Sequence, residues 1–206
     1  MDNCCNNKAS EIEELRKRQS STLKIVLVIN AVMFLVELTT GLLSGSLSLL
    51  ADSLDMLGDT LVYGFSIYVV ARSGRMKAMA ALLKGGIMAA FGFFVLGQAV
   101  YKILFPHVPG FETIGVIGAL ALAANSACLF LLWRHRVDDI NMRSVWLCSR
   151  NDIIANVSVL FAALGVWFTG SGWPDILIGL ALAALFVQSA LSVLRGAVAE
   201  LRTSNV

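Results

Sequence analysis

Six long apolar stretches, separated by short polar or turn-forming segments, dominate the chain. They cover residues 22–44, 46–71, 77–105, 111–133, 144–169 and 174–199. A helix needs about 20 apolar residues to cross a hydrocarbon core of about 30 Å, and each stretch is long enough. Only helices and closed barrels satisfy the backbone in lipid, and no segment has a strand pattern. The sequence therefore predicts an all-α membrane protein with six transmembrane helices.

The ends of the chain are predicted to lie outside this apolar region. Residues 1–21 are polar and lack the apolar core of a cleavable signal peptide, so they indicate a short cytoplasmic tail or one or two amphipathic helical turns. Residues 22–200 form the expected transmembrane domain, and residues 201–206 form a second short tail. No soluble domain is expected, which places the activity in the membrane.

Basic residues predict how the spans are oriented. The segments before the first span, between the second and third, between the fourth and fifth, and after the sixth carry Lys or Arg. The opposite loops carry neither, only Glu112 and Asp175. By the positive-inside rule both termini are cytoplasmic. We expect a multi-pass integral protein of the plasma or inner membrane.

Composition agrees with this interpretation and excludes other classes. Hydrophobic residues make up 57% of the 206 residues and charged residues 15%, too few to coat a soluble domain of this length. The formal net charge of +2 gives no case for nucleic-acid binding. The four cysteines do not form a secreted disulfide framework, because Cys128 and Cys148 fall in apolar spans and Cys4 is adjacent to Cys5.

The second span carries three carboxylates on one stripe. Asp55 and Asp59 are one helical turn apart, and Asp52 lies near the same face. An ionisable residue at the bilayer centre costs at least about 2.5–3.5 kcal/mol on insertion scales and is a functional candidate. A single Asp could be a hydrogen-bonded polar residue between helices. Three together repel one another unless a cation lies among them.

The fifth span carries a matching polar stripe, formed by Cys148, Asp152 and Asn156 at one-turn spacing. Two helices that each offer donors at i and i+4 can build a four-ligand tetrahedral site of the zinc type. Two alternatives stay open. Cys148 could be an inert buried thiol, and Asn156 could be a ligand, although an interhelical hydrogen bond is the favoured interpretation.

Two further charged residues lie in apolar spans. Glu37 in the first span and Lys84 in the third either pair with each other or line a path. For Lys84 we favour a structural role, as an ion-pair partner or as a side chain that snorkels to the interface.

These motifs resemble the cation diffusion facilitator, or cation efflux, family. The segment Gly45 to Asp59 is similar to that family's second-span signature, in which Asp or His precedes Asp by four residues; Asp55 and Asp59 match. The fifth-span signature, usually His then Asp, falls on Cys148 and Asp152. The segment Trp173 to Leu180 is similar to the start of the sixth span. The chain differs in having Cys148 for His, and it resembles a short form without the C-terminal cytoplasmic domain.

The resemblance implies a homodimer that exchanges a divalent metal for protons. We therefore predict an efflux transporter for Zn²⁺, Cd²⁺ or a similar ion, with alternating access around a midplane carboxylate site. Its metal ligands are expected to be Asp55, Asp59, Asp152 and Cys148. No cofactor is expected. Dimerisation is expected through the membrane spans, with close packing permitted by Gly85, Gly86, Gly115 and Gly118.

The same residues allow other interpretations. Cys4 and Cys5 are predicted to capture soft metal near the entrance; the alternative is that they are two thiols without a role. An intramembrane metal-dependent enzyme would need a general base beside the ligands, and no span contains His, so we expect no enzyme. A non-transporting membrane subunit or metal-responsive regulator would leave the acidic stripe unexplained.

Overall fold

The computed structural model describes residues 2–69, 74–133 and 140–203, and within them the side chains of 21–61, 63–64, 79, 81–133 and 152–199. These residues form six helices and no strand. The helices are α1 (Asp2–Ser44), α2 (Leu47–Val69), α3 (Gly74–Leu104), α4 (Phe111–Trp133), α5 (Ile140–Thr169) and α6 (Trp173–Thr203). The predicted all-α fold is confirmed, and each predicted span coincides with one helix.

Five stretches of these helices are long and apolar enough to cross a membrane. They are Ser21–Ser44, Ala81–Leu104, Phe111–Trp133, Asp152–Thr169 and Trp173–Ala199. Helix α2 has 23 residues, as many as α4, but its described side chains cover only residues 47–61 and 63–64, which are too few to form a candidate span by themselves. The expected sixth span is therefore present as a helix, and its passage through the membrane rests on its position in the bundle.

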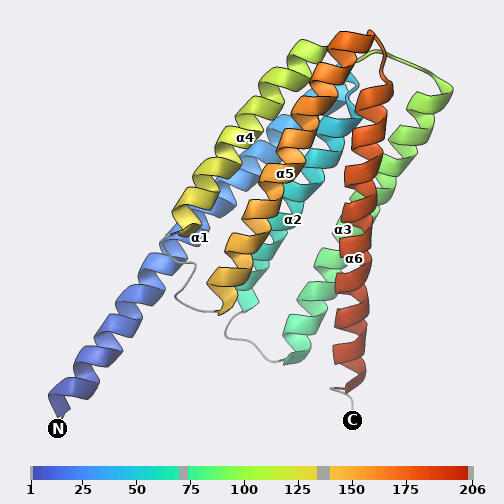
Figure 1. Cartoon of the computed structure of the whole chain (residues 1–206). Coiled ribbons are helices and arrows are strands. Elements are labelled where there is room, and N and C mark those ends of the chain that lie inside the picture. Colours follow the sequence, from blue (N-terminus) through green and yellow to red (C-terminus); the bar gives the residue numbers. More distant parts are fainter. Residues whose placement is uncertain (1, 70–73, 134–139, 204–206) are drawn as a thin grey trace.

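Helix α2 lies at the centre of the bundle and contacts each of the other five helices. The helices run side by side, and the amino end of α1 and the carboxyl end of α6 lie at the same end of the bundle (Figure 1). Apolar side chains of α2, α3 and α6 form the largest buried cluster, which includes Leu50, Leu54, Met88 and Phe186. The central position of α2 explains why residues 46–54 are buried on every side.

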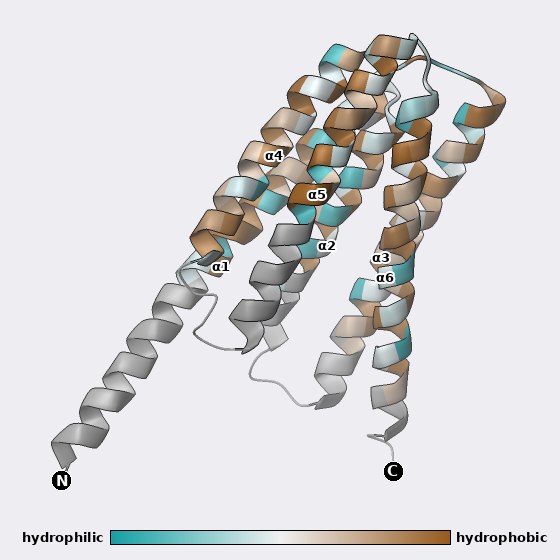
Figure 2. Cartoon of the chain, in the orientation of Figure 1, coloured by the Kyte–Doolittle hydropathy of each residue, from teal (hydrophilic) through white to brown (hydrophobic). Residues whose placement is uncertain are grey.

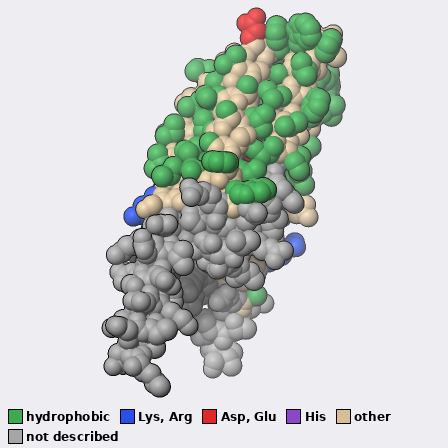
Figure 3. All heavy atoms as spheres, turned by 60° about the vertical axis from the view of Figure 1, so that its left-hand side comes forward, with side chains coloured by type: hydrophobic (Ala, Val, Ile, Leu, Met, Phe, Trp, Pro, Cys, Tyr) green, Lys and Arg blue, Asp and Glu red, His purple; other side chains and the backbone are tan. Residues whose placement is uncertain are grey.

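The outer surface of the described bundle is apolar. Large hydrophobic side chains on several helices are more than half exposed, among them Phe130, Phe161 and Phe168. Hydrophobic side chains are spread over much of the described part of the face in Figure 3. Hydrophilic positions interrupt the apolar ribbon inside the bundle (Figure 2). In a soluble protein this pattern would be inverted, so the exterior suits lipid.

The N-terminal segment differs from expectation. Rather than one or two helical turns, helix α1 begins at Asp2 and continues without a break to Ser44. The sequence provides a reason, because this segment is rich in good helix formers and spaces Glu13 from Lys17, and Glu14 from Arg18, by four residues.

Asp175, which the charge count placed with the loop before the sixth span, belongs to a helix and is buried. It lies in the first turn of α6, is 1% exposed, and accepts hydrogen bonds at the amino end of α2. The donors are Leu47 N (2.6 Å), Ser48 N (3.0 Å), Ser46 Oγ (2.7 Å) and Ser48 Oγ (2.6 Å). A carboxylate at this position satisfies amide donors that a helix leaves unpaired and complements its dipole. Asp175 therefore joins α6 to the start of α2.

The turn between α1 and α2 depends on Gly45. This residue has φ of 66°, a left-handed conformation that follows the last residue of α1, and Ser46 N donates to Gly41 O across it. The Lys102 ammonium of α3 donates to the Gly45 carbonyl. The predicted break at Ser44-Gly45 is thus confirmed as a C-terminal helix cap.

Two of the four glycines predicted to permit dimerisation are used within the chain. A Cβ atom on Gly85 would lie 2.8 Å from the Leu194 side chain of α6, and one on Gly118 would lie 3.2 Å from Val159 of α5. Gly86 has no atom within 4 Å of such a Cβ. Close packing at Gly85 and Gly118 therefore holds helix pairs of one subunit together.

Candidate metal centre

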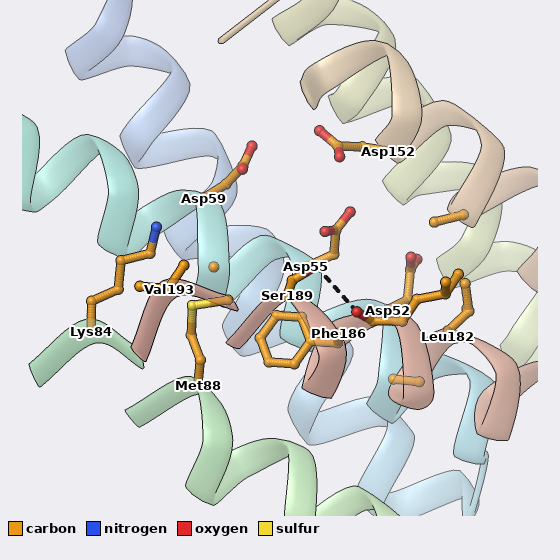
Figure 4. A pocket seen from close by; sticks show the side chains of 14 residues that line it. Asp52, Asp55, Asp59, Lys84, Met88, Asp152, Leu182, Phe186, Ser189 and Val193 are labelled. Carbon is orange, nitrogen blue, oxygen red and sulfur yellow. Dashed lines mark hydrogen bonds between the residues drawn. The ribbon is translucent and has the colours of Figure 1, made fainter. Parts of the chain in front are cut away.

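A cavity of about 400 Å³ lies between helices α2, α3, α5 and α6. Its polar lining comes from both predicted stripes, from α3 and, through Ser189, from α6 (Figure 4). The described residues that line it are Ala51, Asp52, Asp55, Gly58, Asp59, Lys84, Met88, Asp152, Ala155, Leu182, Leu185, Phe186, Ser189 and Val193. The fold thus brings the second-span and fifth-span carboxylates to one space inside the bundle.

Asp55, Asp59 and Asp152 face this cavity from two helices. Asp55 and Asp59 extend from successive turns of α2, and Asp152 extends from α5 on the other side (Figure 4). Asp152 is an electrostatic neighbour of Asp55 across the cavity. Asp152 is only 7% exposed, so its carboxyl group is largely removed from solvent. Oxygen donors from opposite walls are the arrangement that a small divalent cation can bridge.

The described side chains do not form a complete ligand cluster. Among them, no group of three His, Cys, Asp or Glu residues is close enough together to hold a metal ion. Carboxylates in an apolar interior repel one another, and a cation is what draws them together. The cavity therefore supplies acidic walls, and the ligand set stays a prediction.

The predicted cysteines fall outside the described side chains. The backbone of Cys148 belongs to α5, one turn before Asp152, and the backbones of Cys4 and Cys5 belong to α1. Their side-chain positions lie outside the described residues, and their predicted roles stay predictions.

Asp52 and Asn156 belong to a buried hydrogen-bond chain that joins three helices. Asn125 Nδ2 on α4 donates to Asn156 Oδ1 on α5 at 2.9 Å, and Asn156 Nδ2 donates to Asp52 Oδ2 on α2 at 2.8 Å. All three residues are at most 2% exposed. The amide of Asn156 thus makes interhelical hydrogen bonds, the role favoured from its sequence.

Glu37 on α1 is fully buried, and neither of its carboxylate oxygens has a hydrogen-bond partner. Its electrostatic neighbours are Asp52 and Asp55. The alternative that Glu37 pairs with Lys84 is therefore wrong. Lys84 is instead an electrostatic neighbour of Asp59.

Tyr63 is a site residue that the sequence analysis missed. Its hydroxyl donates to Asp59 Oδ2 at 3.2 Å, and its ring is 2% exposed. Its spacing of four residues from Asp59 was the available signal, since such a pair shares one helical face. Tyr63 holds the Asp59 carboxylate at the cavity wall.

The apolar exterior, the six-helix bundle and the acidic cavity define a multi-pass helical membrane protein with a polar centre. The cation efflux transmembrane domain matches residues 23–202, nearly the whole of this bundle. The chain therefore belongs to the cation efflux family, as its motifs indicated.

Several curated relatives are similar to the chain at low identity. "Zinc transporter ZitB" of Yersinia pestis is 26% identical over 88% of this chain and 62% of its own length. "Cadmium, cobalt and zinc/H(+)-K(+) antiporter" of Bacillus subtilis is 25% identical over 85% of the chain and 62% of its length. "Metal cation efflux system protein CzcD" of Cupriavidus metallidurans is 24% identical over 77% and 55%. The chain thus spans less than two thirds of the length of these relatives.

Proposed function

We propose that the chain exports a divalent metal cation, Zn²⁺ or Cd²⁺, from the cytoplasm in exchange for protons. The observation that carries the proposal is the convergence of Asp55, Asp59 and Asp152, from two helices, on one cavity inside an apolar bundle. The names of the relatives support the substrate class, since they specify zinc, cadmium and cobalt, and one specifies antiport with H⁺ and K⁺.

In this proposal the metal is the transported substrate, held by the carboxylates of Asp55, Asp59 and Asp152 and the thiolate of Cys148. Protons that enter from the outer side compete for the same oxygens and release the metal. Access alternates between the two membrane faces around this fixed site. Asp52 and Asn156 then support the site through their hydrogen bonds rather than as ligands. Glu37 is a neighbour of Asp52 and Asp55 and is not a ligand.

The proposal also includes a membrane topology. Helix α2 crosses the membrane as the sixth span, because it is surrounded by helices that are themselves apolar enough to span. Both termini are cytoplasmic, as the distribution of basic residues predicts. Two copies associate through their membrane helices. Because Gly85 and Gly118 pack within one subunit, the contact between copies uses other surfaces.

Proteoliposomes that contain the purified full chain test the function. With an imposed pH gradient, the parent should take up Zn²⁺ and Cd²⁺, and Asp59→Asn and Asp152→Asn should each reduce uptake at least about 100-fold. Glu112→Gln is the matched control, because Glu112 is an exposed acidic residue in the first turn of α4.

Three results would contradict the proposal. Uptake by the Asp152→Asn variant at the parent rate would show that Asp152 is not part of the metal site. Uptake that ignores the pH gradient would refute proton exchange. Absence of uptake by a folded parent would favour the non-transporting subunit.

A further inference from the structure

Lys84 has no role in the proposed set of metal ligands, yet it lies in the same cavity. It extends from α3 and is the single basic residue among the described residues that line the cavity. Its ammonium group lies on the Asp59 side of this space, toward which the side chain rises in Figure 4, and it is an electrostatic neighbour of Asp59. A lysine whose role is to snorkel would extend to the interface rather than line an acidic cavity.

The charges around the cavity explain what a fixed ammonium group does there. Asp55, Asp59 and Asp152 carry three negative charges when ionised, and Lys84 contributes one positive charge. The proposed Cys148 thiolate and the Asp52 carboxylate on the cavity wall add to this negative charge, so Lys84 and a divalent cation together offset part of an acidic set in a region where a net charge is costly. Without the cation, the ammonium group is the only charge on the described cavity wall that attracts these carboxylates.

The ammonium group and the metal also compete. Both are attracted to the Asp59 carboxylate, and they repel each other, with an energy that is larger in a protein interior than in water. A positive charge tethered beside the site therefore weakens metal binding. It also favours the release of the bound ion, since it is already positioned to pair with the vacated carboxylate.

We propose that Lys84 is a tethered counter-cation of the transport site, which pairs with Asp59 when the site is empty and limits the affinity and dwell time of the metal. This inference rests on the proposed function, because it assigns a role in the transport cycle to a residue that is not a ligand. It makes Lys84 a positioning residue that acts through the charge of Asp59.

Metal binding by the purified full chain in detergent tests the proposal, with Zn²⁺ and Cd²⁺ as the probes and titration calorimetry as the readout. Lys84→Met removes the charge and keeps a side chain of similar length. Its dissociation constant should fall about tenfold or more for both ions. Lys84→Arg keeps the charge and should stay within about threefold of the parent. Arg195→Met is the control, because it removes an exposed positive charge of α6 outside the cavity.

Transport kinetics provide a second readout that a purely structural role would not move. In proteoliposomes Lys84→Met should lower both KM and kcat, because the metal binds more tightly and leaves more slowly, whereas a packing defect would raise KM or lower the amount of active protein. Lys84→Gln repeats the test if the Met variant does not fold.

The outcomes separate the two hypotheses. If the parent binds and transports metal but the Met and Gln variants bind it no more tightly, the role of Lys84 is refuted and the proposed function stands. If the folded parent binds no metal at all, the proposed function fails and the role of Lys84 fails with it.

Discussion

From the hydrogen bonds of Asp175 we predict an effect on the stability of the helix bundle, and this prediction does not depend on the transport function. One carboxylate of α6 accepts two backbone and two hydroxyl hydrogen bonds from residues 46–48 at the start of α2. Asp175 and its donors are at most 1% exposed, so water replaces these bonds poorly. Asp175→Ala should therefore loosen α2 at the end where it meets α6.

The expected loss follows from the groups left unpaired. A hydrogen bond to a charged group contributes about 1.5–3 kcal/mol, but four bonds that share one carboxylate are not additive. Removal of the carboxylate leaves the amides of Leu47 and Ser48 buried, at about 1–3 kcal/mol each. We expect Asp175→Ala to lower the free energy of unfolding by about 3–5 kcal/mol. Asp175→Asn should cost about half as much, since one acceptor oxygen remains.

Unfolding by SDS in mixed micelles, followed by tryptophan fluorescence and by helical circular dichroism, measures this difference. Glu112→Ala is the control, because Glu112 also lies in the first turn of a helix but is exposed, and its loss should cost less than about 1 kcal/mol. If Asp175→Ala shifted the transition no further than Glu112→Ala does, the hydrogen bonds between α6 and α2 would not contribute to the free energy of unfolding.

Three other predictions concern the bundle and the site. Asn156→Leu should lower the free energy of unfolding by about 2–4 kcal/mol, because it leaves a buried carboxylate and a buried amide without their hydrogen bonds. In the control Ser158→Ala, the lost hydroxyl bonds only its own helix, and the loss should be under about 0.5 kcal/mol. Equal losses in the two variants would contradict a stabilising role of the Asn156 hydrogen bonds. Gly85→Ala should destabilise by about 1–3 kcal/mol and Gly86→Ala should not, in the same SDS titration; the reverse order would refute the packing argument. Cys148→Ser should reduce Cd²⁺ uptake more than Zn²⁺ uptake, and Cys148→His should restore Zn²⁺ uptake. Unchanged uptake of both metals by Cys148→Ser would refute the thiolate ligand.

The sequence predicted the helices well because apolar length and turn chemistry are local signals. Five of the six apolar stretches end within two residues of the helix end, and α4 coincides with residues 111–133 at both ends. The turns predicted after the first and fifth apolar stretches contain Gly45 and Gly170, which take left-handed conformations. The α1 segment from Asp2 was missed because a polar helix outside the membrane has no apolar face to mark it.

The carboxylates of the site were also predictable, because charged residues are rare in apolar spans. The residues that interact with these carboxylates were harder to predict. Core positions and lipid-facing positions are both apolar in a membrane bundle, and periodicity therefore does not reveal which face of a helix turns inward. Lys84 was predicted to be an ion-pair partner or a snorkelling side chain, and Asp175 was counted with the loop before the sixth span. Only the packing of α3 and α6 against α2 brings the first to the cavity and the second to a helix end.

Helix α2 carries three aspartates, more acidic residues than any other apolar stretch of the chain. Three aspartates at the bilayer centre would cost about 8–10 kcal/mol on insertion scales for an isolated helix. The bundle offsets this cost by surrounding α2 on all sides. Asn156 donates to Asp52 and Tyr63 donates to Asp59, while Asp55 faces the cavity beside Asp152. If α2 holds a cation as we propose, it depends on its neighbours for stability, and a substitution on α4 or α5 that disturbs this polar chain should also reduce metal uptake.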